Sequence, residues 1–242
     1  SAAVSTLGGF PNGVGTIFVQ GAGTVYTFTA TVNIPKNVSV IFEDSATVKS
    51  AGTVAFNIRG RLVNPTFDFD GLATSGFITF SSGSMILGGK AKVITNPTSG
   101  TPIVFQVKDA SNVVVDGLEF TFIDWTGTAN NSGIFLDIEN STKVIVTRCK
   151  FPSQNRIAHA SDQQIRIRGG YDILITDNDL AWKRRLLGMS NQSGQFAFRN
   201  VRYTNNRITV AAGGVAADGM IYMDCNGNIA YSSSVVISGN FI

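Results

Sequence analysis

The stretch from Val144 to Phe151, VIVTRCKF, decides the fold of this chain, because its pattern recurs along the C-terminal half. The pattern is apolar–x–apolar, a small polar residue, a turn-like pair, any residue and a final apolar residue. It returns as VVVDGLEF from Val113, ILITDNDL from Ile173, VRYTNNRI from Val201 and VVISGNFI from Val235, with successive starts 31, 29, 28 and 34 residues apart. A repeat of this length indicates a solenoid of stacked units.

Each repeat also holds an alternating segment before this motif. These segments are IVFQV from Ile103, IFLDI from Ile134, QIRIR from Gln164, QFAFR from Gln195 and MIYMD from Met220. Alternation predicts a strand with one buried face, and the residues after the turn supply a third strand. We therefore predict an all-β fold, a single-stranded right-handed parallel β-helix with three short strands per coil and about 28–34 residues per coil in the C-terminal part. Residues 1–20 are expected to form an extended N-terminal segment and residues 21–242 the β-helix domain.

The composition narrows the classes of function. Only 14% of the 242 residues are charged, so Ser, Thr, Asn and Gly must supply the polar surface, as is typical of β-rich extracellular or virion proteins. The net charge of +3 is too small to indicate a nucleic-acid partner, and no apolar run is long enough to span a membrane. The lone His159 excludes a His-rich zinc site, and we expect neither a metal nor another cofactor.

The repeats resemble the pectate-lyase-like β-helix superfamily. In addition, the segment 23–65, GTVYTFTATVNIPKNVSVIFEDSATVKSAGTVAFNIRGRLVNP, resembles the opening coils of phage tailspike-type proteins. This second resemblance implies a virion protein that binds surface glycans, forms a homotrimer and contacts other virion proteins. The superfamily resemblance implies a polysaccharide groove on the strand that begins each repeat.

Stacking places equivalent residues of the repeats in columns. At the turn, one column reads Leu118, Cys149, Asn178, Asn206 and Asn240. We expect the three Asn side chains to point inward and bond one another as a ladder, with Cys149 an inert buried thiol above them. The acidic triplet Asp177–Asn178–Asp179 is then a corner rather than a metal clamp, and Asp179 is expected to pair with Lys150 and Arg207.

The candidate catalytic residues are Asp137, Glu139, Arg166 and Arg168. Counting back from the motif places Asp137 beside Arg166 and Glu139 beside Arg168 in two outward columns, continued by Ala197 and Arg199. A catalytic and a structural interpretation stay open. The two carboxyls could serve glycoside hydrolysis, or the arginines could bind a uronic carboxylate during lyase chemistry. Alternatively, the four residues form a ladder that neutralises charge, since a carboxylate beside Arg keeps a low pKa and is a poor general acid.

The candidate carbohydrate-binding residues lie in the longer connections. They are Asp124, Trp125, Asp162 and Trp182. The two indoles would stack on sugar rings while the carboxylates bind hydroxyls, or each indole covers the end of its own loop. The run Lys183–Arg185 either contacts an acidic polysaccharide or is simply solvated.

Three functions follow, in order of preference. The first is a phage virion protein of the tailspike or decoration type, located on the virion surface or outside the cell and binding glycans as a trimer. The second is a depolymerase, a hydrolase or lyase of an acidic polysaccharide. The third is a cellular surface adhesin. The Asn-Thr-Asp, Asp-Asp, Gly-His-Gly and Arg-Ile-Lys motifs of polygalacturonases are absent from the sequence, which weighs against the enzyme.

Overall fold

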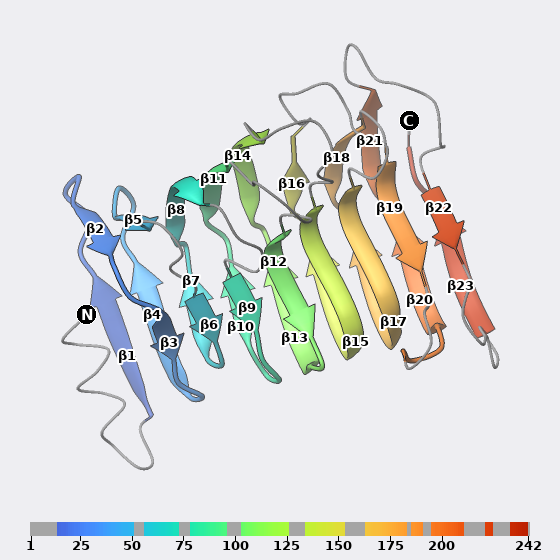
Figure 1. The fold of residues 1–242 in the computed structure, drawn as a ribbon, viewed down its shortest axis with the longest axis horizontal. Helices are drawn as coiled ribbons and strands as arrows, with labels where there is room; N and C mark the ends of the chain where they lie inside the picture. Colours follow the sequence, from blue (N-terminus) through green and yellow to red (C-terminus); the bar gives the residue numbers. More distant parts are fainter. Residues whose placement is uncertain are drawn as a thin grey trace.

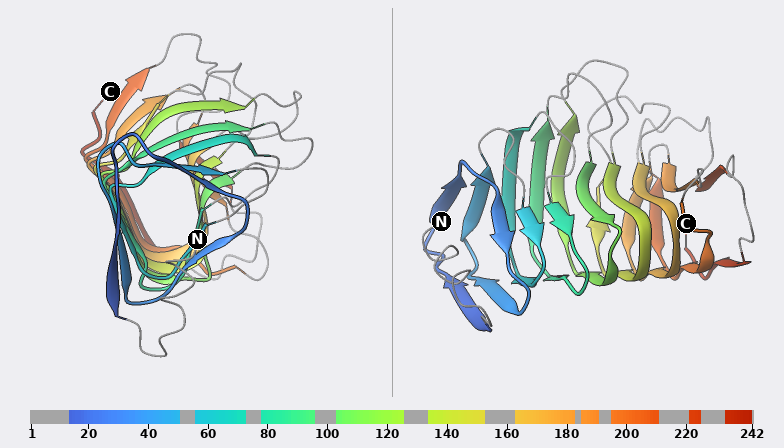
Figure 2. Two further views of the ribbon diagram at one scale, coloured as in Figure 1. Left: turned by 90° about the vertical axis from the view of Figure 1, so that its left-hand side faces the viewer. Right: turned by 60° about the horizontal axis from the view of Figure 1, so that its bottom comes forward.

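The computed structural model shows a right-handed parallel β-helix, as predicted, in which successive coils lie side by side along one long axis (Figure 1). The structure describes residues 14–50, 56–72, 78–95, 103–125, 134–152, 163–182, 185–190, 195–210, 221–224 and 233–241. Within these ranges all regular structure is β-strand, and no helix is present that is long and apolar enough to cross a membrane. Viewed along the axis, the coils superimpose around one central region (Figure 2).

The first face of the solenoid carries the strand that begins each coil. Its strands pair in parallel with the equivalent strands of the coils before and after. They are β3 (Val32–Ile34), β6 (Phe56–Ile58), β9 (Ile78–Phe80), β12 (Ile103–Lys108), residues 134–139 of β15 (Ile134–Thr147), residues 163–168 of β17 (Gln163–Thr176), β19 (Arg185–Ser190) and β22 (Ile221–Asp224).

The second face follows after a corner of about two residues. In β15 and β17 one continuous strand element turns this corner, so that residues 142–147 and 171–176 belong to the second face. The other strands of this face are β1 (Gly15–Val19), β4 (Val38–Phe42), β7 (Arg61–Val63), β10 (Met85–Leu87), β13 (Ser111–Asp116), β20 (Arg199–Thr204) and β23 (Ser233–Ser238).

The third face is a separate eight-stranded sheet, reached from the second face through the turn motif. Its strands are β2 (Val25–Phe28), β5 (Thr47–Ser50), β8 (Thr66–Leu72), β11 (Lys90–Thr95), β14 (Glu119–Trp125), β16 (Lys150–Phe151), β18 (Asp179–Trp182) and β21 (Arg207–Val210).

The observed strand register confirms the repeat. Val113, Val144, Ile173, Val201 and Val235, the first residues of the five motifs, pair in one unbroken row. All but Val235 are buried in the core, where alternate residues of every face point inward. Aromatic rings stack in the same way across coils, with Phe120 and Phe151 at a centroid distance of 5.1 Å. Because each coil covers the apolar residues of the next, the core is continuous along the axis.

The asparagine ladder is also confirmed. Oδ1 of Asn178, Asn206 and Asn240 accepts the backbone N–H of Cys149, Asn178 and Asn206 respectively, at 2.9–3.0 Å. Each Nδ2 then donates to a carbonyl of the preceding coil, at Val146, Ile175 and Tyr203. The Cys149 thiol makes the corresponding contact with the Val115 carbonyl, at 3.6 Å. The ladder satisfies backbone groups that the bend would otherwise leave unpaired inside the core.

One strand lies elsewhere than the sequence pattern predicted. The segment QFAFR from Gln195 contains no strand before Arg199, and the first face continues instead through β19. Gly188, not Ala197, therefore follows Arg166 in its column, while Arg199 pairs with Tyr171 on the second face. Leu186, Leu187 and Met189 of β19 enter the core, whereas in QFAFR only Phe198 is buried and Phe196 stays exposed.

Candidate functional site

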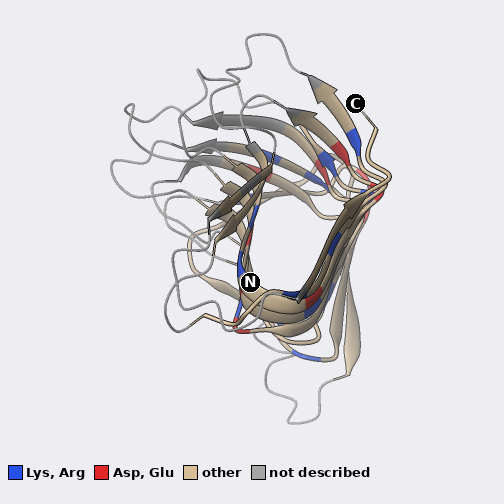
Figure 3. Cartoon of the chain, turned by 90° about the vertical axis from the view of Figure 1, so that its right-hand side faces the viewer, with Lys and Arg blue, Asp and Glu red and all other residues tan. Residues whose placement is uncertain are grey.

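The four predicted catalytic residues come together on the first face. Asp137 of β15 is in register with Arg166 of β17, and Glu139 is in register with Arg168, as the column counting predicted. Leu136 and Ile138 alternate with the two acids and point into the core, so the carboxylates lie on the outer side of the sheet. Charged residues occupy only short parts of the cross-section, and most of the ribbon carries none (Figure 3).

Asp137 is the centre of this cluster. Its side chain is fully buried, and it accepts hydrogen bonds from Arg166 Nε at 2.7 Å and from Arg168 Nε and Nη2 at 3.3 and 2.6 Å. Burial by itself raises the pKa of Asp137, but the hydrogen bonds and charges of the two arginines outweigh it and hold the pKa below the usual range. The carboxylate is therefore ionised at neutral pH and has no proton to donate.

Glu139 occupies the adjoining position and shares Arg168 with Asp137. Arg168 Nη2 donates to Glu139 Oε2 at 2.5 Å, while Lys108 Nζ of the preceding coil lies 3.2 Å from Oε1. The sequence prediction missed Lys108, although the same column counting, extended to β12, places it beside Glu139. With Lys108 included, the cluster holds three cations and two carboxylates, a net charge of +1.

Arg166 differs from Arg168 in how many of its donors are used. Within the described part of the chain, Arg166 bonds only through Nε, and its two terminal nitrogens have no partner. Its side chain keeps 19% of its surface exposed. The neighbouring column position is Gly188, where a Cβ would collide with the Gln163 side-chain amide. Gln163 Oε1 is buried and lacks a hydrogen-bond partner among the described residues, so the unpaired donors of Arg166 are the groups on this part of the face that a ligand could reach.

The predicted carbohydrate-binding residues cannot be placed side chain by side chain. Asp124 and Trp125 end β14 and Trp182 ends β18, so the backbone positions all three at the end of third-face strands. Their side chains, and Asp162 with the pair 183–184 altogether, lie outside the described residues. The roles of these four residues remain predictions.

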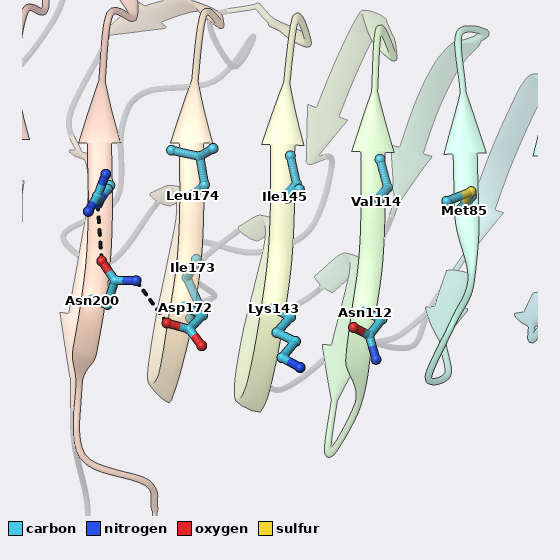
Figure 4. A pocket seen from close by; sticks show the side chains of 10 residues that line it. Met85, Asn112, Val114, Lys143, Ile145, Asp172, Ile173, Leu174 and Asn200 are labelled. Carbon is cyan, nitrogen blue, oxygen red and sulfur yellow. Dashed lines mark hydrogen bonds between the residues drawn. The ribbon is translucent and has the colours of Figure 1, made fainter.

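A hollow of about 510 Å³ lies elsewhere, on the second face. Figure 4 shows a row of polar side chains, Asn112, Lys143, Asp172 and Asn200, running across neighbouring coils beside a row of apolar ones, Met85, Val114, Ile145 and Leu174. Asn200 Nδ2 donates to Asp172 Oδ1 at 2.8 Å. These outward residues stand at the variable positions of the repeat, and their columns follow from the same alignment of coils.

Two other chemical candidates in the sequence are structural. Burial raises the pKa of Cys149 to about 12, as expected for an inert core thiol. At the corner, Arg207 bonds Asp179 while Lys150 bonds Glu119 at 3.1 Å, so the acids there form exposed cross-coil pairs with cations. In the described residues, His, Cys, Asp and Glu nowhere gather in threes as a metal site would require.

Comparison with known proteins identifies the fold. No family model matches the chain, and no curated protein matches its sequence. The crystal structure of PfbA, a surface adhesin of Streptococcus pneumoniae, is similar over 97% of this chain and 78% of that chain, with a TM-score of 0.54 and 10% identity. This likeness shows the fold alone. The A-module of the mannuronan C-5 epimerase AlgE4 of Azotobacter vinelandii aligns over 99% and 89% of the two chains at 11% identity, but its TM-score of 0.33 carries no argument.

Proposed function

We propose that this protein binds acidic glycans at a biological surface, through Arg166 on the first face, without cleaving them. The observation that carries this proposal is that the buried Asp137 binds only one of the three nitrogens of the partly exposed Arg166. The buried carboxylate fixes the guanidinium through Nε, the two terminal nitrogens have no partner among the described residues, and the side chain is 19% exposed. A carboxylate or sulfate group of a sugar fits such a planar pair of donors.

The same geometry argues against the depolymerase interpretation. A glycosidase needs one carboxylic acid that is protonated at the working pH, which requires a raised pKa. Asp137 has a lowered pKa and no exposed surface. A hydrolase using Asp137 and Glu139 is therefore the weaker alternative, and the arginine cluster is better suited to hold an anion than to protonate a leaving group.

The setting of the protein is a further part of this proposal. The resemblance of segment 23–65 to tailspike opening coils favours the surface of a phage virion, with other virion proteins as partners and a trimeric assembly. The fold likeness to a bacterial surface adhesin favours the outer surface of a cell. Both settings are extracellular and both supply glycans. Immunogold electron microscopy of phage lysates and of whole cells, with antibodies against this chain, distinguishes them.

A glycan array followed by a product assay tests the function. We expect retention of the protein on glycans that carry uronate, sialate or sulfate groups and not on their neutral counterparts. The glycans that bind are then incubated with the protein and assayed for reducing ends and for unsaturated uronates, with no product expected. Binding confined to neutral glycans would refute the anion site, and product formed by an Asp137→Asn, Glu139→Gln variant would place catalysis elsewhere.

A further inference from the structure

The outer side of the second face is chemically self-complementary, and we infer that it joins two copies of this chain as a two-fold dimer. This inference does not depend on the glycan site, because it concerns another face of the solenoid. It replaces the trimeric assembly that the tailspike resemblance favours, and the experiment below decides between dimer and trimer. Three parallel rows of outward side chains carry the argument: a polar row, an apolar row and a corner row.

The apolar row crosses six consecutive coils. By register its members are Met85, Val114, Ile145, Leu174, Arg202 and Val236. Met85, Ile145 and Val236 are 37%, 38% and 41% exposed, so three large apolar side chains of one row face solvent. Arg202 interrupts the row before Val236, and the uninterrupted apolar part runs through Met85, Val114, Ile145 and Leu174. An apolar patch of this kind on a sheet face marks an interaction surface.

The polar row lies two residues before the apolar row. Its members are Gly83, Asn112, Lys143, Asp172, Asn200 and Ser234, and every one of them has a positive φ. Lys143 has no ion-pair partner among the described residues, and Asp172 accepts only the Asn200 amide. Lys143 and Asp172 therefore present a cation and an anion on adjacent coils, and neither has an ion-pair partner within the described part of the chain (Figure 4).

A single symmetry axis pairs both rows favourably. We place a two-fold axis in the interface, parallel to the strands and midway between β15 and β17, so that the order of coils is reversed in the second copy. Lys143 then faces the second copy's Asp172, Asn112 faces its Asn200, and Gly83 faces its Ser234. In the apolar row Ile145 faces Leu174 and Met85 faces Val236, while Val114 meets the aliphatic stem of Arg202.

The corner row repeats the same complementarity at the other end of the strands. Its members are Gly88, Gly117, Arg148, Asp177, Asn205 and Gly239, which share a positive φ. The axis that pairs Lys143 with Asp172 also brings Arg148 opposite Asp177. Arg148 is already bonded to Asp116 within its own chain, so this second pair adds charge matching rather than a new isolated bond. In both rows the axis places a cation of one copy opposite an acid of the other. This indicates that a second copy of the chain covers the second face.

The dimensions of the face suit a small specific interface. Six strands at a spacing of ~4.8 Å, each ~17 Å long between the polar and corner rows, cover about 480 Å² per copy. Two copies would bury on the order of 1,000 Å², which is the lower limit for a specific contact. The hollow of about 510 Å³ is lined by both Lys143 and Asp172, so it lies across the proposed axis and leaves room for side chains of the second copy.

Charge reversal tests this inference with a built-in rescue. Sedimentation equilibrium at low ionic strength should show a monomer–dimer equilibrium that weakens as salt is added. Lys143→Asp and Asp172→Lys should each weaken dimerisation by at least roughly 100-fold, because the symmetry places two like-charged contacts in the interface. The double exchange Lys143→Asp, Asp172→Lys should restore it to within about threefold. Both replacements suit the backbone, since Lys and Asp already occupy left-handed positions in this row.

The control is Lys90→Asp, which reverses an exposed charge on the third face and should leave the dimer intact. Circular dichroism of each variant establishes that the β-helix is preserved. A wild-type chain that stays monomeric on the order of 100 μM overturns the inference. So do a trimer, single reversals without effect, or a double exchange that fails to restore association. A monomer whose glycan binding is lost on Lys143→Asp would assign the second face to a glycan instead.

Discussion

Arg166 of one coil lies in register with Asp137 of the preceding coil, and its Nε donates a 2.7 Å hydrogen bond to that wholly buried carboxylate. Arg168 bonds the same carboxylate from the position two residues along β17. The acid is thus a support for two guanidinium groups. We propose that this relationship makes Arg166 an anchored anion receptor instead of half of an acid–base pair. It also makes the stability of the first face dependent on pH.

Acid should weaken the wild-type fold through Asp137. Its folded pKa lies below its unfolded value of about 3.9, so the unfolded state takes up the proton first as pH falls. The stabilisation is present above about pH 4 and is lost as pH drops through the folded pKa. Urea unfolding between pH 7 and pH 2 should show a smaller loss in Asp137→Asn than in wild type. If the free energy of unfolding fell equally with pH in the two proteins, the lowered pKa would be contradicted.

Removal of the Asp137 side chain should be costly at neutral pH. Asp137→Ala leaves two guanidinium groups without their shared acceptor, and we expect a loss of about 3 kcal/mol in the free energy of unfolding. Asp68→Ala on the third face removes a carboxylate from a more exposed pair with Lys92, at 3.5 Å, and should cost less than about 1 kcal/mol. Similar losses in the two variants, measured by urea unfolding, would show that the cluster on the first face is not special.

Asn206→Ala should destabilise the chain by about 3 kcal/mol, since it removes the side-chain acceptor of the Asn178 backbone N–H and the side-chain donor to the Ile175 carbonyl inside the core. Asn57→Ala is the matched control, because Asn57 bonds Asn33 across coils in the same way but at the surface, and should cost less than about 0.5 kcal/mol. Both free energies come from denaturant unfolding. A cost for Asn206→Ala below that of the control would refute the ladder as a source of stability.

Cys149 should be unreactive in the folded protein. With a pKa of about 12, its thiolate fraction at pH 8 is on the order of 1,000-fold smaller than that of an unperturbed thiol. Alkylation of a Cys225→Ser variant, in which Cys149 is the remaining thiol, should be slower than in urea by at least this factor. Rapid alkylation of the native protein would place Cys149 at the surface.

The sequence predicted those parts of the fold that repeat. The motif starting at Val144 defined the column of Asn178 and Asn206, and the alternation of IFLDI and QIRIR brought Asp137 beside Arg166. Column counting gave the wrong strand in one coil, because QFAFR was predicted as the first-face strand whereas the structure places that strand at β19, which contains LLGM. Burial decides between such segments, and burial depends on neighbouring coils that the local pattern does not encode.

The chemistry of the site was less accessible to sequence reasoning than its position. Counting columns places a carboxylate beside an arginine but does not tell how deeply either is buried. The full burial of Asp137 and the partial exposure of Arg166 distinguish the two partners, with Asp137 as the support and Arg166 as the proposed binding group. The outer rows of the second face were not predicted because residues such as Asn112 and Ile145 stand at the variable positions before and within the repeat motif, so that they show a pattern only when the coils are aligned.

The central claim is tested most directly by calorimetric titration of an acidic oligosaccharide, chosen as the best ligand on the glycan array, into wild type, Arg166→Gln and Lys92→Gln. Lys92→Gln removes a charge from the third face, so it controls for net charge. The account predicts that Arg166→Gln weakens binding by about 10- to 100-fold while Lys92→Gln leaves it unchanged. Equal affinities for wild type and Arg166→Gln would contradict it.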